Sequence, residues 1–169
     1  GLQQVEQAVA DALAHLVLLI PLVLPAATEG PYTYTVTDGQ ATITGFDYTY
    51  SGALSITNEL GGCPVISIGP RAFYDCTSLT SVTVPDSVTN IEDEAFEGCS
   101  ALTSVTIGNR VACIGWHAFF RCSALSSVTI GNNVTTIESS TFRDCSALTF
   151  VLFTGDVPTT FFPDAFENT

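Results

Sequence analysis

The sequence predicts a mainly β repeat solenoid, in which short coils of the chain stack around one continuous core. Three observations support this fold class. Large apolar residues recur every 23 residues, as Phe73, Phe96, Phe119 and Phe142 show. Each copy contains a run that alternates apolar and polar residues, which is the period of a β-strand. A hairpin signal also precedes the first copy. Because one such coil cannot bury its own apolar edges, the copies must stack.

Residues 1–27 are predicted to form an apolar, partly amphipathic helical arm followed by a linker. The segment contains good helix formers up to Pro21, and its apolar residues fall at helical spacing. Near its end, in HLVLLIPLVLP, it becomes apolar all round. An ordered apolar arm on a soluble protein needs a cover, and other copies of the arm are the simplest one. The residues expected to self-associate are Leu2, Val5, Val9, Leu13, Leu16, Val17, Ile20 and Val23.

Three other interpretations of this arm stay open. A signal peptide would explain the apolar run before PAA, but Glu6 and Asp11 stand where a basic region would be expected. A bilayer span needs about 20 mostly apolar residues, whereas the apolar run here is shorter and holds two prolines. We therefore expect no membrane span. The arm could also lie against its own solenoid as a cap.

Residues 28–67 are predicted to form the N-terminal cap of the solenoid. YTYTVTDGQATITGF contains two alternating runs on either side of Asp38-Gly39, which is a strong signal for a β-hairpin. ALSITNELGGCPVISIG follows as an irregular opening coil, with extra residues before Val65 and Ile68. We expect a hairpin and then a coil that departs from the regular repeat.

Residues 68–153 carry the regular repeats, and AFEGCSALTSVTIGNRVACIGWH is a typical unit. In its strand, Leu102, Val105 and Ile107 are expected to face the core, and Ser104 and Thr106 to face outward. The AFxxC turn then returns the chain to the other side. Seven columns recur in register, starting from Ile68, Phe73, Cys76, Leu79, Val82, Val84 and Val88. The last of these columns is expected to end at Val157, and residues 154–169 to form an incomplete terminal coil.

The repeat resembles the BspA-type leucine-rich repeat family. That family's pattern IGxxAFxxCxxLxxVxIPxxVxxI is legible in IGPRAFYDCTSLTSVTVPDSVTNI, and the resemblance extends from Tyr32 to Phe166. It implies leucine-rich-repeat coils with short strands on one face. It also implies an exported or cell-surface protein of the kind used in adhesion and interaction, without catalytic residues.

The charge balance narrows the classes of partner. The chain has 17 acidic residues, four arginines and no lysine, for a formal net charge of −13. Such a charge repels phosphate backbones, so we expect no nucleic-acid partner. Only 12% of the residues are charged, so hydroxyl and amide groups must cover most of the surface. This composition is typical of an extracellular or cell-surface protein.

No cofactor, metal site or catalytic group is expected. One cysteine per coil, flanked by Phe and Leu, is typical of a small buried side chain, and no CxxC metal motif is present. Cys63 and Cys113 lie outside that column and are the likelier pair if a disulfide exists. The acidic EDEAFE segment lacks the ligand spacing of a calcium loop. Neither histidine lies near a nucleophile motif.

Three groups of residues remain as candidates for binding. The strand face carries two outward rows, which could bind a polysaccharide: Ser81, Ser104 and Ser127, and Thr83, Thr106 and Thr129. Four large residues interrupt their columns and form a candidate partner surface: Phe150, Leu152, Trp116 and Phe120. Asn133 begins an NVT sequon and is a possible glycosylation site.

Together these features lead us to expect a secreted, non-enzymatic structural or interaction protein that self-associates through its N-terminal apolar helix. We expect the protein to be a homo-oligomer or a homopolymer, for example the subunit of an extracellular filament. The alternative is a monomeric cell-surface adhesin or carbohydrate-binding module that uses the Ser/Thr strand face. Glycans and host or surface proteins are the expected outside partners.

Overall fold

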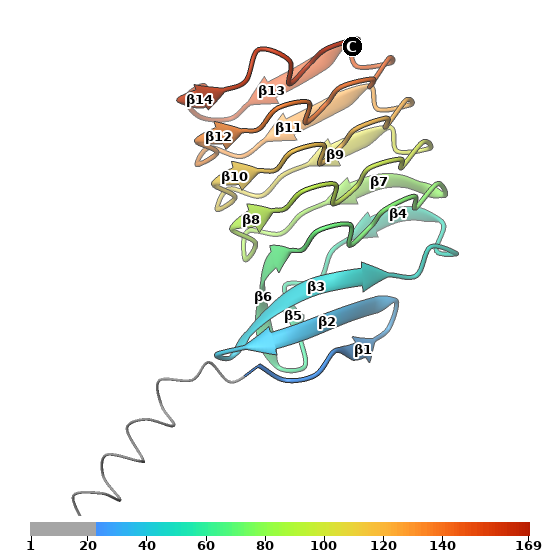
Figure 1. The fold of residues 1–169 in the computed structure, drawn as a ribbon, viewed down its shortest axis with the longest axis vertical. Coiled ribbons are helices and arrows are strands. Elements are labelled where there is room, and N and C mark those ends of the chain that lie inside the picture. Colours follow the sequence, from blue (N-terminus) through green and yellow to red (C-terminus); the bar gives the residue numbers. More distant parts are fainter. Residues whose placement is uncertain (1–22) are drawn as a thin grey trace, which may run out of the picture.

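The chain is a mainly β solenoid, seen here in a computed structural model that describes residues 23–169. Coils stack along one axis, with a strand of each regular coil on each of two faces (Figure 1). The residues described form fourteen strands, β1 to β14, and contain no helix. The solenoid expected from the 23-residue repeat is therefore confirmed.

The predicted helical arm lies almost wholly outside the described residues. Its last part is extended rather than helical, because Val23 forms an antiparallel bridge with Thr37. The Leu24 N–H also donates to the Val36 carbonyl at 2.9 Å. Within residues 23–169, no helix is long and apolar enough to cross a membrane.

An antiparallel meander closes the N-terminal end of the solenoid. Its strands are β1 (Ala27–Glu29), β2 (Tyr32–Thr37) and β3 (Gln40–Phe46). The β2–β3 turn has φ of 51° at Asp38 and 73° at Gly39, which are the positive values that a tight type I′ hairpin requires. The hairpin predicted from this dipeptide is present. Alternate residues of β2 are buried, so the hairpin covers one end of the core.

The first coil is irregular. It comprises β4 (Gly52–Ser55), β5 (Glu59–Leu60) and β6 (Cys63–Ile68). Strand β5 pairs with β6 in an antiparallel way, beside the main stack. Strand β4 is already parallel to the next coil, with Leu54 opposite Val82.

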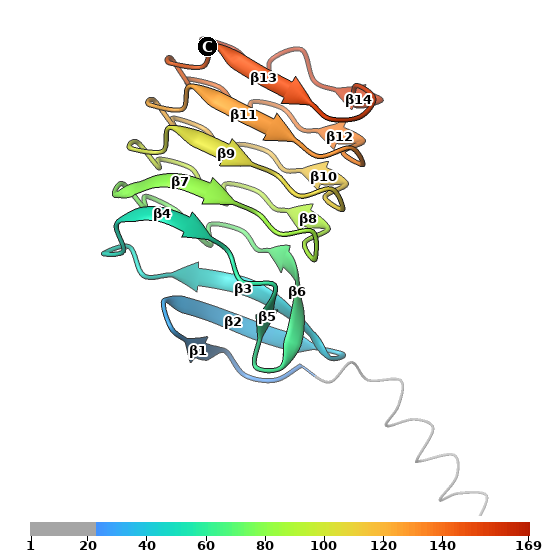
Figure 2. The same cartoon turned by 180° about the vertical axis from the view of Figure 1, so that it is seen from behind.

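The later coils contribute one strand to each of two parallel stacks (Figure 2). A five-stranded sheet continues from β4 through β7 (Leu79–Thr83), β9 (Ser104–Thr106), β11 (Ser127–Ile130) and β13 (Phe150–Phe153). The opposite, nine-stranded sheet contains β1, β2, β3, β5 and β6. It continues through β8 (Asn90–Ile91), β10 (Cys113–Ile114), β12 (Thr136–Ile137) and β14 (Thr160–Phe161).

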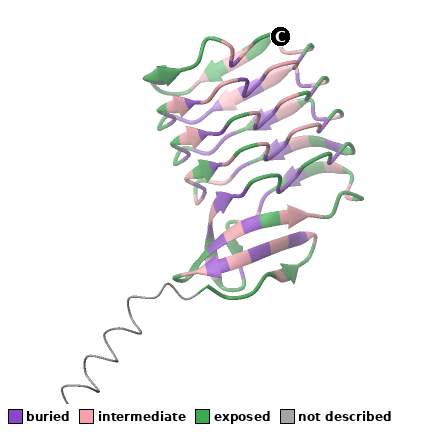
Figure 3. Ribbon diagram, viewed as in Figure 1, coloured by how far each residue is buried: buried purple, intermediate pink, exposed green. Residues whose placement is uncertain are grey.

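A stack of phenylalanine rings runs through the core between the two sheets, where Figure 3 shows the buried residues. Phe73, Phe96, Phe119 and Phe142 are all 0% exposed. Successive ring centroids in this stack lie 4.7, 5.1 and 5.3 Å apart. Phe46 extends the stack toward the N-terminal cap, with its centroid 4.7 Å from that of Phe73. The repeat therefore places identical rings at the distance of favourable aromatic contact.

The last coil departs from the predicted register. Phe161 pairs with Ile137, so this coil is one residue longer than those before it. Pro158 is buried at the position that the 23-residue spacing assigned to Val157, and Val157 is 67% exposed. The prediction for Val157 was wrong because the turn after β13 carries one extra residue.

Candidate functional site

The five-stranded sheet aligns the two hydroxyl rows across its coils. Its parallel register places Ser81 opposite Ser104 and Thr83 opposite Thr106. The next strand continues the rows with Ser127 and Thr129. Strand β4 begins them with Ala53 and Ser55, and β13 ends them with Phe150 and Leu152.

Hydroxyls of the residues that directly precede these strands join one coil to the next. Thr103 donates to the Thr80 carbonyl at 2.8 Å, and Ser126 donates to the Thr103 carbonyl at 3.0 Å. In contrast, no hydrogen bond links the side chains of the six row residues to any residue in the described part of the chain. The rows are therefore free to bond with a ligand.

A groove of about 360 Å³ follows the carboxyl ends of β7, β9 and β11. Its wall carries Thr83, Thr106 and Thr129. Asp86 and Asn109 lie on its rim, where the Asp86 carboxylate accepts the Asn109 N–H at 2.6 Å. The rim is thus held by a contact between coils, and the groove extends to a fourth coil, where Thr154 lines it.

The strands of the five-stranded sheet carry no charged side chain, although the chain has 17 acidic residues and four arginines; a charge that lies beside them is that of Asp86, on the rim of the groove. No Asp, Glu, Lys or Arg occurs in the segments that form this face, which are residues 52–58, 76–85, 99–109, 122–135 and 145–155. The sequence analysis missed this feature, although the segments themselves contain the signal. Uncharged strands with free hydroxyls favour a neutral, hydrogen-bonding ligand.

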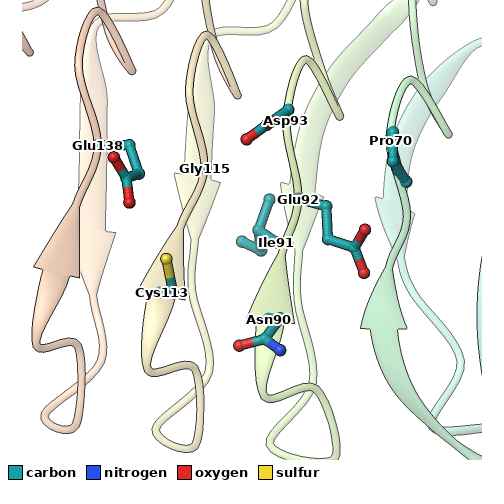
Figure 4. Close-up of a pocket in the computed structure, with 8 residues that line it drawn as sticks. All are labelled: Pro70, Asn90, Ile91, Glu92, Asp93, Cys113, Gly115 and Glu138. Atoms are coloured by element: carbon teal, nitrogen blue, oxygen red, sulfur yellow. The ribbon is translucent and has the colours of Figure 1, made fainter.

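The nine-stranded sheet has a second depression, of about 280 Å³, shown in Figure 4. Asn90, Glu92, Cys113 and Glu138 come to it from three successive coils. Glu92 already accepts the Ser67 hydroxyl at 2.6 Å. Burial, with help from Glu138, raises the pKa of the Cys113 thiol, which disfavours the reactive thiolate. Among residues 23–169, no three His, Cys, Asp or Glu side chains are placed to hold a metal ion.

All six cysteines are free thiols, including Cys63 and Cys113. The cysteines of the regular coils are buried as expected. The thiols of Cys99, Cys122 and Cys145 donate to phenylalanine carbonyls 26 residues earlier, as from Cys122 to Phe96 at 3.2 Å. Burial raises the pKa of the Cys76 thiol to about 12. These cysteines therefore pack the interior and join coils.

Trp116 and Phe120 belong to one stack on the turn between β10 and β11, in which Trp116 is exposed and Phe120 is half-buried. The His117 ring lies between them, with centroids 3.6 Å from Trp116 and 4.3 Å from Phe120. The Arg121 guanidinium lies 4.7 Å from the Phe120 ring centroid. Burial lowers the pKa of His117, so the imidazole is neutral at pH 7. The sequence columns identified Trp116 and Phe120 but not the intervening histidine.

The remaining candidates lie apart from this stack. Phe150 and Leu152 are 55% and 44% exposed, at the end of the hydroxyl rows. Asn133 is exposed, but its Nδ2 donates to the Asn109 carbonyl at 2.6 Å. Val23 is 61% exposed. The other seven residues of the predicted self-association surface lie outside the described residues.

The comparisons with known proteins agree with this architecture. The family model of the BspA type leucine rich repeat region matches residues 47–169 in six copies. A leucine-rich repeat protein from Bacteroides capillosus is 34% identical over 77% of this chain and 99% of its own, with a TM-score of 0.70. The leucine rich repeat protein of T. pallidum is 25% identical over 78% of this chain, with a TM-score of 0.68.

A leucine rich cell surface protein from Faecalibacterium prausnitzii is 31% identical over 77% of this chain, with a TM-score of 0.59. The present chain spans 65% of the T. pallidum protein and 43% of the F. prausnitzii protein. No curated protein sequence matches the chain. Because six family repeats match most of its length, the chain belongs to the BspA type leucine-rich repeat family.

Proposed function

We propose that this chain is a non-enzymatic cell-surface interaction protein whose five-stranded face binds a neutral glycan. The observation that carries the proposal is the uncharged sheet with two rows of unbonded hydroxyls. The F. prausnitzii relative is named as a cell surface protein, which supports an extracellular or cell-surface location and a role in adhesion.

The chemistry of the face suits a sugar chain. Serine and threonine hydroxyls both donate and accept hydrogen bonds, as sugar hydroxyls do. Each such bond contributes about 1 kcal/mol net, and the hydroxyl rows themselves contain no charged group that binding would remove from water. Coils repeat about every 4.8 Å, so an extended chain that follows the solenoid axis meets the same pair of hydroxyls repeatedly. Phe150 and Leu152 add an apolar surface at one end of the rows.

Replacing the threonine row tests this proposal. A variant with Thr83→Val, Thr106→Val and Thr129→Val keeps the β-branched shapes and removes three hydroxyls. We expect it to lose most of its binding on a neutral glycan array, with the affinity checked by calorimetry. The matched control replaces Thr42, Thr136 and Thr160, which lie on the nine-stranded sheet, and should bind as the wild type does. The proposal fails if no neutral glycan binds, or if the two triple variants bind equally.

Self-association through the apolar arm is a second candidate function. Val23 and Leu24, where the arm joins the solenoid, are 61% and 45% exposed, and exposed apolar surface favours association. The proposed role is that of a homo-oligomer or extracellular filament subunit. Deleting residues 1–22 leaves the contacts of residues 23–29 with β2 in place. We expect a folded monomer by light scattering; an unchanged particle mass would refute this role.

A further inference from the structure

The turns that precede the strands of the five-stranded sheet form a continuous ridge along the solenoid. We define the connecting ridge as residues 70–76, 92–99, 115–122, 138–145 and 162–168. Backbone hydrogen bonds join successive turns, as from the Phe96 N–H to the Ala118 carbonyl and from the Phe119 N–H to the Thr141 carbonyl. The ridge is thus a surface of fixed shape, separate from the hydroxyl rows.

One turn of the ridge presents aromatic rings to solvent. Trp116, His117 and Phe120 stack with interplanar angles of 16° and 19°. Trp116 remains 41% exposed although His117 covers part of it. The turn also holds the Trp116 backbone, because its N–H donates to the Asp93 carboxylate at 2.9 Å. The indole is therefore a supported, accessible platform.

The ridge around this platform is strongly acidic. Nine of the 17 acidic residues of the chain lie on it: Asp75, Glu92, Asp93, Glu94, Glu97, Glu138, Asp144, Asp164 and Glu167. It also carries three arginines, of which Arg71 is paired with Glu94 and Arg143 with Glu167. The turn of residues 115–122 itself contains no acidic residue. Arg121 lies beside the platform, but nine carboxylates against three arginines leave the ridge negative as a whole, and a negative field favours a cation at an aromatic platform.

The ridge already uses cation–π contacts within the chain. The Arg121 guanidinium lies over Phe120 at 4.7 Å, and the Arg71 guanidinium lies over Tyr74 at 5.3 Å. Tryptophan is the best aromatic partner for such a cation. We propose that Trp116 receives a lysine or arginine side chain from a basic segment of a partner protein. The surrounding carboxylates of the ridge then attract the rest of that segment.

The position of Trp116 makes the proposal directly measurable, because it is the only tryptophan in the chain. The probe is a blocked peptide of alternating glycine and arginine, titrated into the 169-residue chain at low salt. We expect a saturable change in tryptophan fluorescence that weakens as salt is raised. The matched peptide with citrulline in place of arginine is uncharged and should produce no such change.

Variants locate the contact on the ridge. By calorimetry, Trp116→Leu should weaken arginine-peptide binding by about two- to thirtyfold, which is the range expected for one cation–π contact. Trp116→Phe should retain part of the affinity. Tyr48→Leu removes an aromatic side chain that is 73% exposed outside the ridge, and it should bind as the wild type does. Thermal unfolding of each variant checks that the fold is retained.

Three results would overturn the inference. These are equal binding of the citrulline peptide, equal affinities of the Trp116→Leu and Tyr48→Leu variants, and amide NMR shifts that map to β7, β9 and β11 instead of the ridge. The threonine triple variant should bind the arginine peptide normally. A failure of glycan binding therefore leaves the arginine-peptide test valid. A failure of arginine-peptide binding likewise leaves the glycan test valid.

Discussion

The phenylalanine stack permits a quantitative test of how the coils hold together. Phe96 is 0% exposed, and its ring lies 4.7 Å from Phe73 and 5.1 Å from Phe119, with interplanar angles of 11° and 2°. Each aromatic pair contributes about 0.5–1.5 kcal/mol beyond the area that it buries. Phe96→Leu keeps an apolar side chain but loses both pairs, so we expect a loss of about 1–3 kcal/mol in the free energy of unfolding.

Phe96→Ala removes the contacts and leaves a cavity, so its expected cost rises to about 3–5 kcal/mol. Circular dichroism during urea unfolding measures both variants, with hydrogen exchange to show whether the coils unfold together, since repeat arrays can lose cooperativity. Phe150→Leu is the control, because that ring is 55% exposed and should change stability by less than about 0.5 kcal/mol. If Phe96→Leu costs no more than this control, the stacked rings do not hold the coils together.

Three further predictions follow from the packing. Gly131→Ala should destabilise the fold by about 1–3 kcal/mol or more in urea unfolding, because the added methyl would meet a backbone oxygen of the preceding coil at 2.3 Å. The thiols of Cys76 and Cys113, whose pKa values are raised by burial, should react with a disulfide reagent at pH 8 much faster after denaturation than before. The lowered pKa of His117 predicts a fluorescence titration of Trp116 with a midpoint below 6.5. It also predicts that the contribution of this histidine to stability decreases as the pH falls through 6.5, because the unfolded chain binds the proton more tightly; a midpoint above 6.5 would contradict both statements.

The strand-face residues could be predicted from the sequence. Ser104 and Thr106 alternate with buried Val105 in a period of two, and the 23-residue repeat brings each of them beside its equivalents. What could not be predicted is which hydroxyls are free. Thr103 directly precedes the same strand, but its hydroxyl donates to the Thr80 carbonyl. That difference depends on where each side chain lies relative to the strand of the preceding coil.

The connecting ridge has a feature that the repeat columns of the sequence do not predict. The repeat identified Trp116 and Phe120 as exceptions, but it did not place His117 between them. His117 has a φ of 56°, and this left-handed backbone helps to set the direction of the ring. At the C-terminal end of the solenoid the repeat also failed, because an extra residue displaces Val157 from its column.

The sequence by itself determined the solenoid, the hairpin and the buried columns, because each depends on periodicity and on backbone preferences of single residues. The tertiary structure alone decided the form of the two proposed binding surfaces. The groove beside Thr106 exists because the strand ends of successive coils lie together, and the Trp116 platform exists because one turn is supported by the acidic turn before it. Both surfaces depend on contacts between residues about 23 positions apart, where the conformation of one coil determines what the next exposes.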